Sequence, residues 1–347
     1  MEYDTLVNLA AAVGLVGLMA YALLGGADFG GGVWDLFATG PRRNAQRQVI
    51  ARAMGPVWEA NHVWLIFVIV LMFTCFPRGY APLAVAMFIP FHLALVGIML
   101  RGAAFVFRGY LSRPGGRAAD EPPGFWELSF GISSVITPLL LGAAFGAITA
   151  GGIQVSADGT VLTAWPPAWL RPYSLGCGVL ALSTCAYLAA VYLTVETDGD
   201  LRDDFRRRAI VAGTATAGLA LIVLILAYCQ APWFFEQLTR PRAWPVLAAG
   251  LFFFAASAWA VFSRRYKLSR IFAAAEVALL LAGWGLAQHP YFCYPDLTLM
   301  GSAGPEATIR FLLLALPVGA VVLVPSLWLL LRVFKATAPA ARAGDSL

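Results

Sequence analysis

Residues 6–37 read LVNLAAAVGLVGLMAYALLGGADFGGGVWDLF, and this stretch decides the fold. A helix needs about 20 mostly apolar residues to cross the hydrocarbon core of a bilayer, and the segment up to Leu24 approaches that length by itself. No basic region precedes the apolar run and no cleavage site of small residues follows it. We therefore predict a retained helix that continues to about Phe37, and not a signal peptide. The run Gly25–Gly32 lacks the Lys-Ser/Thr of a phosphate loop, so we interpret it as a site of close helix packing.

The composition of the whole chain points the same way. Of its 347 residues, 60% are hydrophobic and only 12% are charged, whereas an ordinary soluble domain is about 45–50% apolar and about 25% charged. The net charge of +5 is carried by short basic clusters between long apolar runs. This distribution is typical of a membrane protein and argues against a nucleic-acid partner.

Nine stretches are long and apolar enough to cross a bilayer. They are 6–24, 57–76, 83–107, 126–150, 173–195, 209–230, 244–262, 271–287 and 311–333. Because every backbone polar group must be paired inside the bilayer, we predict an all-α, polytopic helical bundle. No loop is long enough for a soluble domain, so we expect one transmembrane domain over residues 1–335 and a disordered cytoplasmic tail over 336–347.

The basic residues alternate from one connection to the next. Five of the 24 lie in one set of loops and Arg101 lies inside a span. Eighteen lie in the other set: Arg42, Arg43, Arg47, Arg52, Arg108, Arg113, Arg117, Arg202, Arg206, Arg207, Arg208, Arg264, Arg265, Lys267, Arg270, Arg332, Lys335 and Arg342. By the positive-inside rule, this distribution predicts nine spans with the N-terminus outside and the C-terminus in the cytoplasm.

Four charged residues lie inside predicted spans, namely Asp28, Glu59, Arg101 and Glu276. At about 1.5 Å of rise per residue, each lies roughly 9–13 Å from the cytoplasmic end of its helix. Charges at such depth are costly unless paired and are often functional. Two interpretations stand: a structural cluster that holds helices together, or a proton-conducting site that is reached from the cytoplasm.

His62 follows Glu59 by three residues and shares its helical face, with Trp58 and Asn61 beside it. A histidine beside a buried acid is suited to proton relay, because its ordinary pKa lies near neutrality. The other histidines, His92 and His289, are isolated, and a lone histidine is weak evidence for haem ligation. We expect no directly bound cofactor and no metal, and the five cysteines have no CxxC spacing.

Four segments resemble subunit II of the cytochrome bd-type quinol oxidases. They are GGADFGGGVWDLF (25–37), AMGPVWEANHVWLI (53–66), RGAAFVFR (101–108) and FWELSFGISSVITPLLLGAAFG (125–146). Over residues 1 to about 210, the order and spacing of the motifs and the loop charges agree with the family. The rest of the chain resembles the family only in its number of spans and its hydropathy. The chain departs from the family at Gly25, where an acid is frequent, and in its Glu-Ala-Asn-His in place of Asp-Gly-Asn-Gln.

The resemblance implies nine helices, arranged as two four-helix bundles plus one peripheral helix. It implies a haem-free subunit that pairs with a haem-bearing subunit I, which carries b-type and d-type haems. The complex would oxidise quinol and reduce dioxygen to water in the bacterial cytoplasmic membrane. Lipids, quinone and a small single-helix subunit are the further partners expected.

Residue roles follow from the same resemblance together with the depths above. We assign proton transfer to Glu59, Asp28 and His62. Charge pairing is assigned to Arg101 and Glu276, and a motif or interface role to Trp58, Asn61 and Trp64. Two other classes remain as alternatives: a secondary transporter with an intramembrane ion site, which inverted repeats would favour, and a purely structural assembly subunit.

Overall fold

The computed structural model describes residues 2–111, 124–156, 158–162 and 164–336. For some helical positions the structure describes the backbone but not the side chain: 56, 59, 109–111, 324, 327 and 330–336. Arg113, Arg117 and Arg342 also lie outside the described residues, as does the expected tail apart from Ala336.

Long helices dominate the described chain. They are α1 (Tyr3–Leu36), α2 (Arg43–Cys75), α4 (Phe88–Leu111), α5 (Phe125–Thr149), α6 (Pro172–Val195), α7 (Gly199–Gln230), α9 (Trp244–Phe262), α10 (Tyr266–Gln288) and α12 (Glu306–Ala336). Eight helices of the described residues are long and apolar enough to cross a membrane, and the bent α2 makes nine when it is counted as one span. The all-α, polytopic architecture expected from the sequence is confirmed.

Two of the predicted spans differ from the structure in shape. The stretch 83–107 is broken at Met87 into the short α3 (Pro77–Ala86) and α4. In α2, the parts Arg43–Gly55 and Ala60–Cys75 are inclined at 49° to each other. The sequence at this bend is Gly55-Pro56, and a proline removes one hydrogen bond of the helix ladder, which is a usual cause of a kink.

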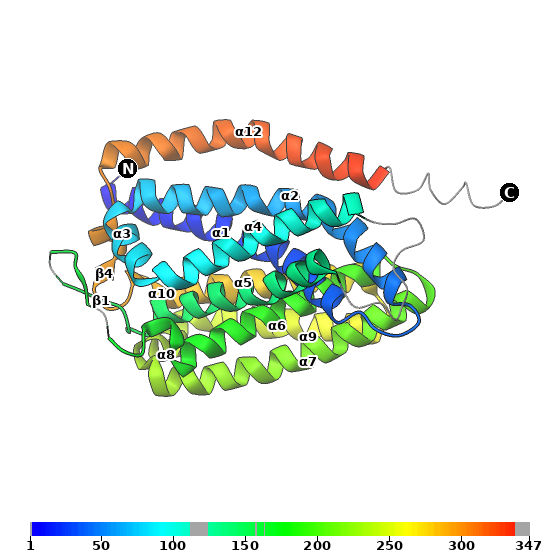
Figure 1. Ribbon diagram of the computed structural model, residues 1–347. Coiled ribbons are helices and arrows are strands. Elements are labelled where there is room, and N and C mark those ends of the chain that lie inside the picture. Colours follow the sequence, from blue (N-terminus) through cyan, green and yellow to red (C-terminus); the bar gives the residue numbers. More distant parts are fainter. Residues whose placement is uncertain (1, 112–123, 157, 163, 337–347) are drawn as a thin grey trace.

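The helices run side by side along one axis, and α12 lies along the outside of the molecule, against α1 and α2 (Figure 1). The central helices are α1, α5 and α6, which all contact one another. Because α5 packs on α6 as extensively as on α4, helix contacts do not separate the molecule into two halves. The predicted division into two four-helix bundles and one peripheral helix therefore stays a prediction.

Close approach of the central helices depends on the glycine run of α1. A Cβ atom added to Gly30 would lie 1.8 Å from the backbone carbonyl oxygen of Cys185 in α6. One added to Gly32 would lie 2.0 Å from the hydroxyl oxygen of Ser134 in α5. The run is thus a packing surface for two neighbouring helices, as small residues provide in membrane proteins.

One end of the bundle is closed by short elements. They are β1 (Gln154–Val155) and β2 (Val161–Leu162), η1 (Ala168–Leu170), α8 (Pro232–Thr239), η2 (Pro241–Ala243), β3 (Tyr291–Cys293) and β4 (Leu297–Thr298), and α11 (Leu299–Ser302). The strands form two antiparallel hairpins. The opposite end carries the connections 37–42, 196–198 and 263–265 and with them the described members of the basic set, so we name it the basic end (Figure 1).

This arrangement predicts which positions react from each side of a membrane. Single cysteines at Asp158 and Glu236, at the hairpin end, should react with a membrane-impermeant maleimide on intact cells. Cysteines at Arg43 and Arg264 should react only after permeabilisation, because the basic end is expected inside. The unsubstituted chain measures the background from Cys229, which is exposed. Labelling of Arg43→Cys and Arg264→Cys from opposite sides would contradict the topology.

Candidate functional site

A buried ion pair joins α1 to α4 in the interior of the bundle. Its members are Asp28 and Arg101, whose side chains are 1% and 2% exposed. The Nη2 atom of Arg101 donates to Asp28 Oδ1 at 2.7 Å and to the backbone carbonyl of Asp28 at 2.7 Å. Its Nη1 atom donates to Asp28 Oδ2. This is the two-pronged guanidinium–carboxylate geometry that gives strong, directional pairing.

Two further helices add hydrogen bonds to the pair. Asn61 of α2 donates from Nδ2 to Asp28 Oδ2 at 2.8 Å. Arg101 donates from Nε to the hydroxyl of Ser134 in α5 at 2.9 Å. The guanidinium also lies over the rings of Phe29 and Phe130, 5.0 and 4.7 Å from their centroids. Such contacts offset the large cost of taking two charges out of water.

The glycine run explains why this pair can form where it does. Ser134 occupies the space that a side chain at position 32 would need, and its hydroxyl donates to the carbonyl of Phe130 at 2.7 Å. That bond leaves the Ser134 oxygen as an acceptor for Arg101. The absence of a Cβ at Gly32 therefore positions a hydrogen-bond acceptor of the buried guanidinium.

A second layer of charges lies between the first pair and the basic end. Asp35, 1% exposed, pairs with Arg108 at 2.9 Å and with Arg47 at 4.0 Å. Arg47 also reaches Glu127 at 3.1 Å. Asp35 follows Asp28 by seven residues, and Arg108 follows Arg101 by seven. Two helical turns on each helix thus repeat the acid–arginine pairing roughly 10 Å further along.

The sequence reasoning missed this second layer. Both residues, Asp35 and Arg108, lie near helix ends, where charged residues are common; Arg108 was counted only as evidence of topology, and Asp35 was given no role. The signal that identifies them is the shared spacing of seven, because residues seven apart lie on one face of a helix. An acid and an arginine repeated at that interval on two neighbouring helices predict two ion pairs in register.

The motif of α2 surrounds the first pair only in part. Glu59 lies at the bend of α2, and its side chain is outside the described structure. His62 donates from Nδ1 to the carbonyl of Trp58 at 2.8 Å, one turn earlier in its own helix. The Trp58 ring stacks on Phe105 at 5.6 Å between centroids, while its buried Nε1 atom has no acceptor among the described residues. Trp64 contacts Phe67 edge-on at 6.0 Å.

The structure does not bring Glu276 into this cluster. Glu276 lies in α10, and its buried Oε2 atom accepts no hydrogen bond within the described part of the chain. None of the ion pairs of the described residues includes it, so the pairing expected for Glu276 is not found there. Among those residues, no group of three or more His, Cys, Asp or Glu side chains could hold a metal ion.

Comparison with known proteins places this architecture in a family. The model of cytochrome bd terminal oxidase subunit II matches residues 6–334. The putative cytochrome bd menaquinol oxidase subunit II of Bacillus subtilis (strain 168) is 24% identical over 344 residues, covering 95% of each chain. The cytochrome bd-I ubiquinol oxidase subunit 2 of Escherichia coli (strain K12) is 26% identical over 202 residues, 57% of this chain and 51% of that protein.

A solved structure agrees with the fold. A chain of the bd oxidase from Geobacillus thermodenitrificans superposes with a TM-score of 0.79 at 23% identity, covering 95% of this chain and 98% of that one. The family model matches nearly the whole length of the chain. The chain is a member of the cytochrome bd terminal oxidase subunit II family, and thus a membrane-spanning subunit of a quinol oxidase complex.

Proposed function

We propose that this chain is the haem-free subunit of its oxidase, and that it supports assembly and delivers protons from the cytoplasm. Quinol oxidation and reduction of dioxygen to water would take place on a haem-bearing subunit I, with b-type and d-type haems. We place the complex in the bacterial cytoplasmic membrane with the basic end inside. The observation that carries the proposal is the series of buried acids that begins at that end, Asp35 and then Asp28.

The two layers differ in what they are suited to do. Asp35 is paired with arginines that are 12% and 18% exposed, so the outer layer lies close to the polar surface of the basic end. Asp28 is held by Arg101 and Asn61 in the interior. Asn61 follows Glu59 by two residues in α2. We infer that protons pass from the outer layer to the region of Asp28 and Asn61, and that Glu59 and His62 carry them onward.

Replacing Glu59 with glutamine tests this function. The amide keeps the shape of the acid but cannot release a proton, so the complex should assemble with normal haem content. We expect its rate of oxygen consumption with quinol to fall about tenfold or more. This fall is smaller than the rate factor that a positioned acid or base commonly contributes. Haem spectra of the purified complex and oxygen-electrode rates per haem measure the two quantities.

Two variants make the Glu59 result specific. Glu59→Asp keeps a carboxyl group and should retain most of the turnover. Glu306→Gln removes an exposed acid at the hairpin end and should leave the rate unchanged. Normal turnover per haem in Glu59→Gln would favour the second candidate function, a structural subunit whose buried charges only hold helices together. One observation favours that candidate: each side-chain oxygen of Asp28 and each guanidinium nitrogen of Arg101 takes part in at least one hydrogen bond.

A further inference from the structure

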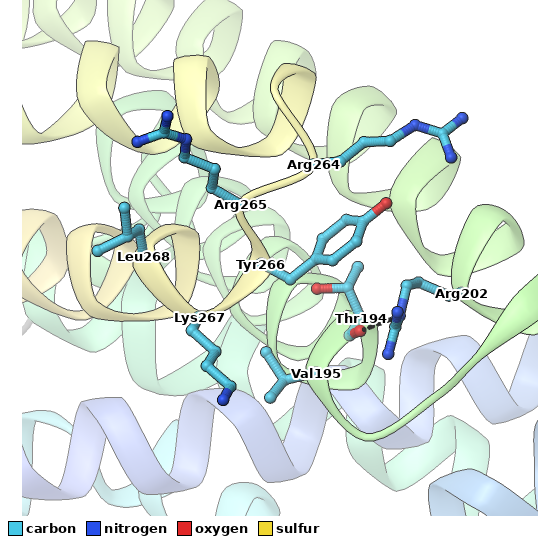
Figure 2. A pocket seen from close by; sticks show the side chains of 8 residues that line it. All are labelled: Thr194, Val195, Arg202, Arg264, Arg265, Tyr266, Lys267 and Leu268. Carbon is cyan, nitrogen blue, oxygen red and sulfur yellow. Dashed lines mark hydrogen bonds between the residues drawn. The ribbon is translucent and has the colours of Figure 1, made fainter.

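A cavity of about 400 Å³ opens at the basic end, away from the ion-pair layers. It lies where the end of α6 and the start of α7 meet the turn between α9 and α10 (Figure 2). Its walls include four basic residues, Arg202, Arg264, Arg265 and Lys267, together with Tyr266. So dense a group of cations around one hollow predicts an anionic ligand.

Only part of this positive charge is neutralised by the chain itself. Arg202 donates to Asp198 at 2.5 Å and to the carbonyl of Thr194 at 3.1 Å, and its guanidinium lies over Tyr266. Arg264 approaches Asp203 at 3.5 Å. Within the described residues, neither Arg265 nor Lys267 has an acidic partner, and both are exposed at the rim.

The backbone adds to this positive potential. Helix α10 begins at Tyr266, and no side chain caps its N-terminus. The first amides of an α-helix have no partner inside the helix, and the helix dipole places partial positive charge there. The start of this 23-residue helix lies in the cavity wall between Arg265 and Leu268. Side-chain cations and helix amides therefore act on the same hollow.

The surroundings of the cavity distinguish a lipid from a small soluble anion. Leu268 lines the cavity and is 36% exposed, and Ile271, one turn further along α10, is 59% exposed. On α9, Phe262 and Trp259 are 60% and 50% exposed, and the guanidinium of Arg265 lies over the Trp259 ring at 5.0 Å. An apolar, outward-facing surface thus continues from the basic rim along the helices.

The orientation of the side chains agrees with this distinction. The side chains of Arg264, Arg265 and Lys267 point in three different directions, whereas Arg202 points toward Thr194, so the four do not converge on one point (Figure 2). A small enclosed anion would need convergent donors, whereas a headgroup at a membrane surface needs positive charge around its edge. Basic pockets between helix ends are a recognised form of headgroup binding.

We propose that this cavity binds the phosphate-bearing headgroup of an anionic phospholipid, whose acyl chains lie along the exposed faces of α9 and α10. Arg265 and Lys267 provide the uncompensated charge, and the start of α10 faces the phosphate. The site would hold a lipid to the subunit at the end of the membrane where the basic residues gather.

The test uses the purified two-subunit complex after delipidation. Phosphatidylglycerol, phosphatidylcholine or inorganic phosphate is added, and bound molecules are counted by native mass spectrometry over a concentration series. Arg265→Gln with Lys267→Gln removes two cations from the rim. Arg78→Gln with Arg240→Gln removes two exposed cations from the hairpin end and serves as the matched control. Normal haem content shows that each variant is folded.

We expect the wild-type complex and the control to bind phosphatidylglycerol in preference to phosphatidylcholine. The rim variant should bind phosphatidylglycerol about tenfold more weakly, because each basic residue near a membrane surface contributes a several-fold change in affinity for anionic lipid. Equal affinity in the rim variant and the wild type would overturn the site. The lipid assignment would be overturned if the wild-type complex bound inorganic phosphate, showed no preference for phosphatidylglycerol, and lost the phosphate binding in the rim variant.

Discussion

Replacing Arg101 with leucine is expected to prevent the oxidase complex from accumulating in the membrane. The variant leaves the carboxylate of Asp28 buried without its guanidinium partner, and breaking a buried pair in this way costs about 3–5 kcal/mol. A typical domain is stable by only about 5–15 kcal/mol, so a large share of the stability would be lost. Immunoblots of membranes and haem absorbance per milligram of membrane protein measure the amount of complex.

The double variant Asp28→Leu with Arg101→Leu is the matched control. Exchanging both members of a buried pair for apolar residues of similar size is often neutral, so the double variant should accumulate far better than the single one. Asn61 loses its carboxylate acceptor in that variant, which makes the recovery incomplete. Wild-type levels of the single variant would show that the pair contributes little to stability.

The position of Arg101 opposite Asp28 illustrates what depth along a helix can predict. Counting residues from the basic end places both at a similar height, and their helices turn out to be joined at that height. The same count places Glu276 at a similar height, yet it forms no ion pair with a described residue. Residue counting determines position along an axis, whereas direction around the helix and the choice of neighbour depend on packing.

The bends and breaks of the helices were harder to predict from the sequence. A hydropathy profile averages over a window that is longer than a helical turn, so it cannot show the interruption at Met87 inside an apolar stretch. The bend of α2 has a local signal in Gly55-Pro56, because proline removes a backbone donor. The two hairpins consist of strands of two or three residues, which is too short for an alternating pattern to identify.

Basic residues illustrate how one signal can have two causes. The cluster of Arg264, Arg265 and Lys267 was interpreted as evidence of membrane orientation, and the structure also places it around a cavity. Topology requires only that such residues lie on one side of the membrane. Their gathering with Arg202, which comes from a different connection, becomes visible only when the helices are assembled.

A substitution where α1 crosses α6 is expected to have the second large effect on assembly of the complex. Gly30→Ala is expected to abolish assembly, although alanine normally favours a helix over glycine by about 1 kcal/mol. The new Cβ would lie 1.8 Å from the carbonyl oxygen of Cys185 and 2.7 Å from the Cβ of Ala189. The carbonyl belongs to the backbone of α6, so no side-chain rotation can relieve the clash, and the two helices must separate.

Separation of α1 from α6 would also disturb Asp28, which is two residues before Gly30 on α1. We therefore expect the folded state to lose about 3 kcal/mol or more of stability, which is the upper end of the usual cost of overpacking an interior. Little complex should then be found in membranes. Gly218→Ala in α7 is the matched control, because nothing lies within 4 Å of the Cβ that it would add. That variant should keep or slightly raise the melting temperature of the purified complex. If Gly30→Ala accumulated and melted like Gly218→Ala, the contact between α1 and α6 would have to be more yielding than the structure indicates, and the glycine run would need another explanation than close packing.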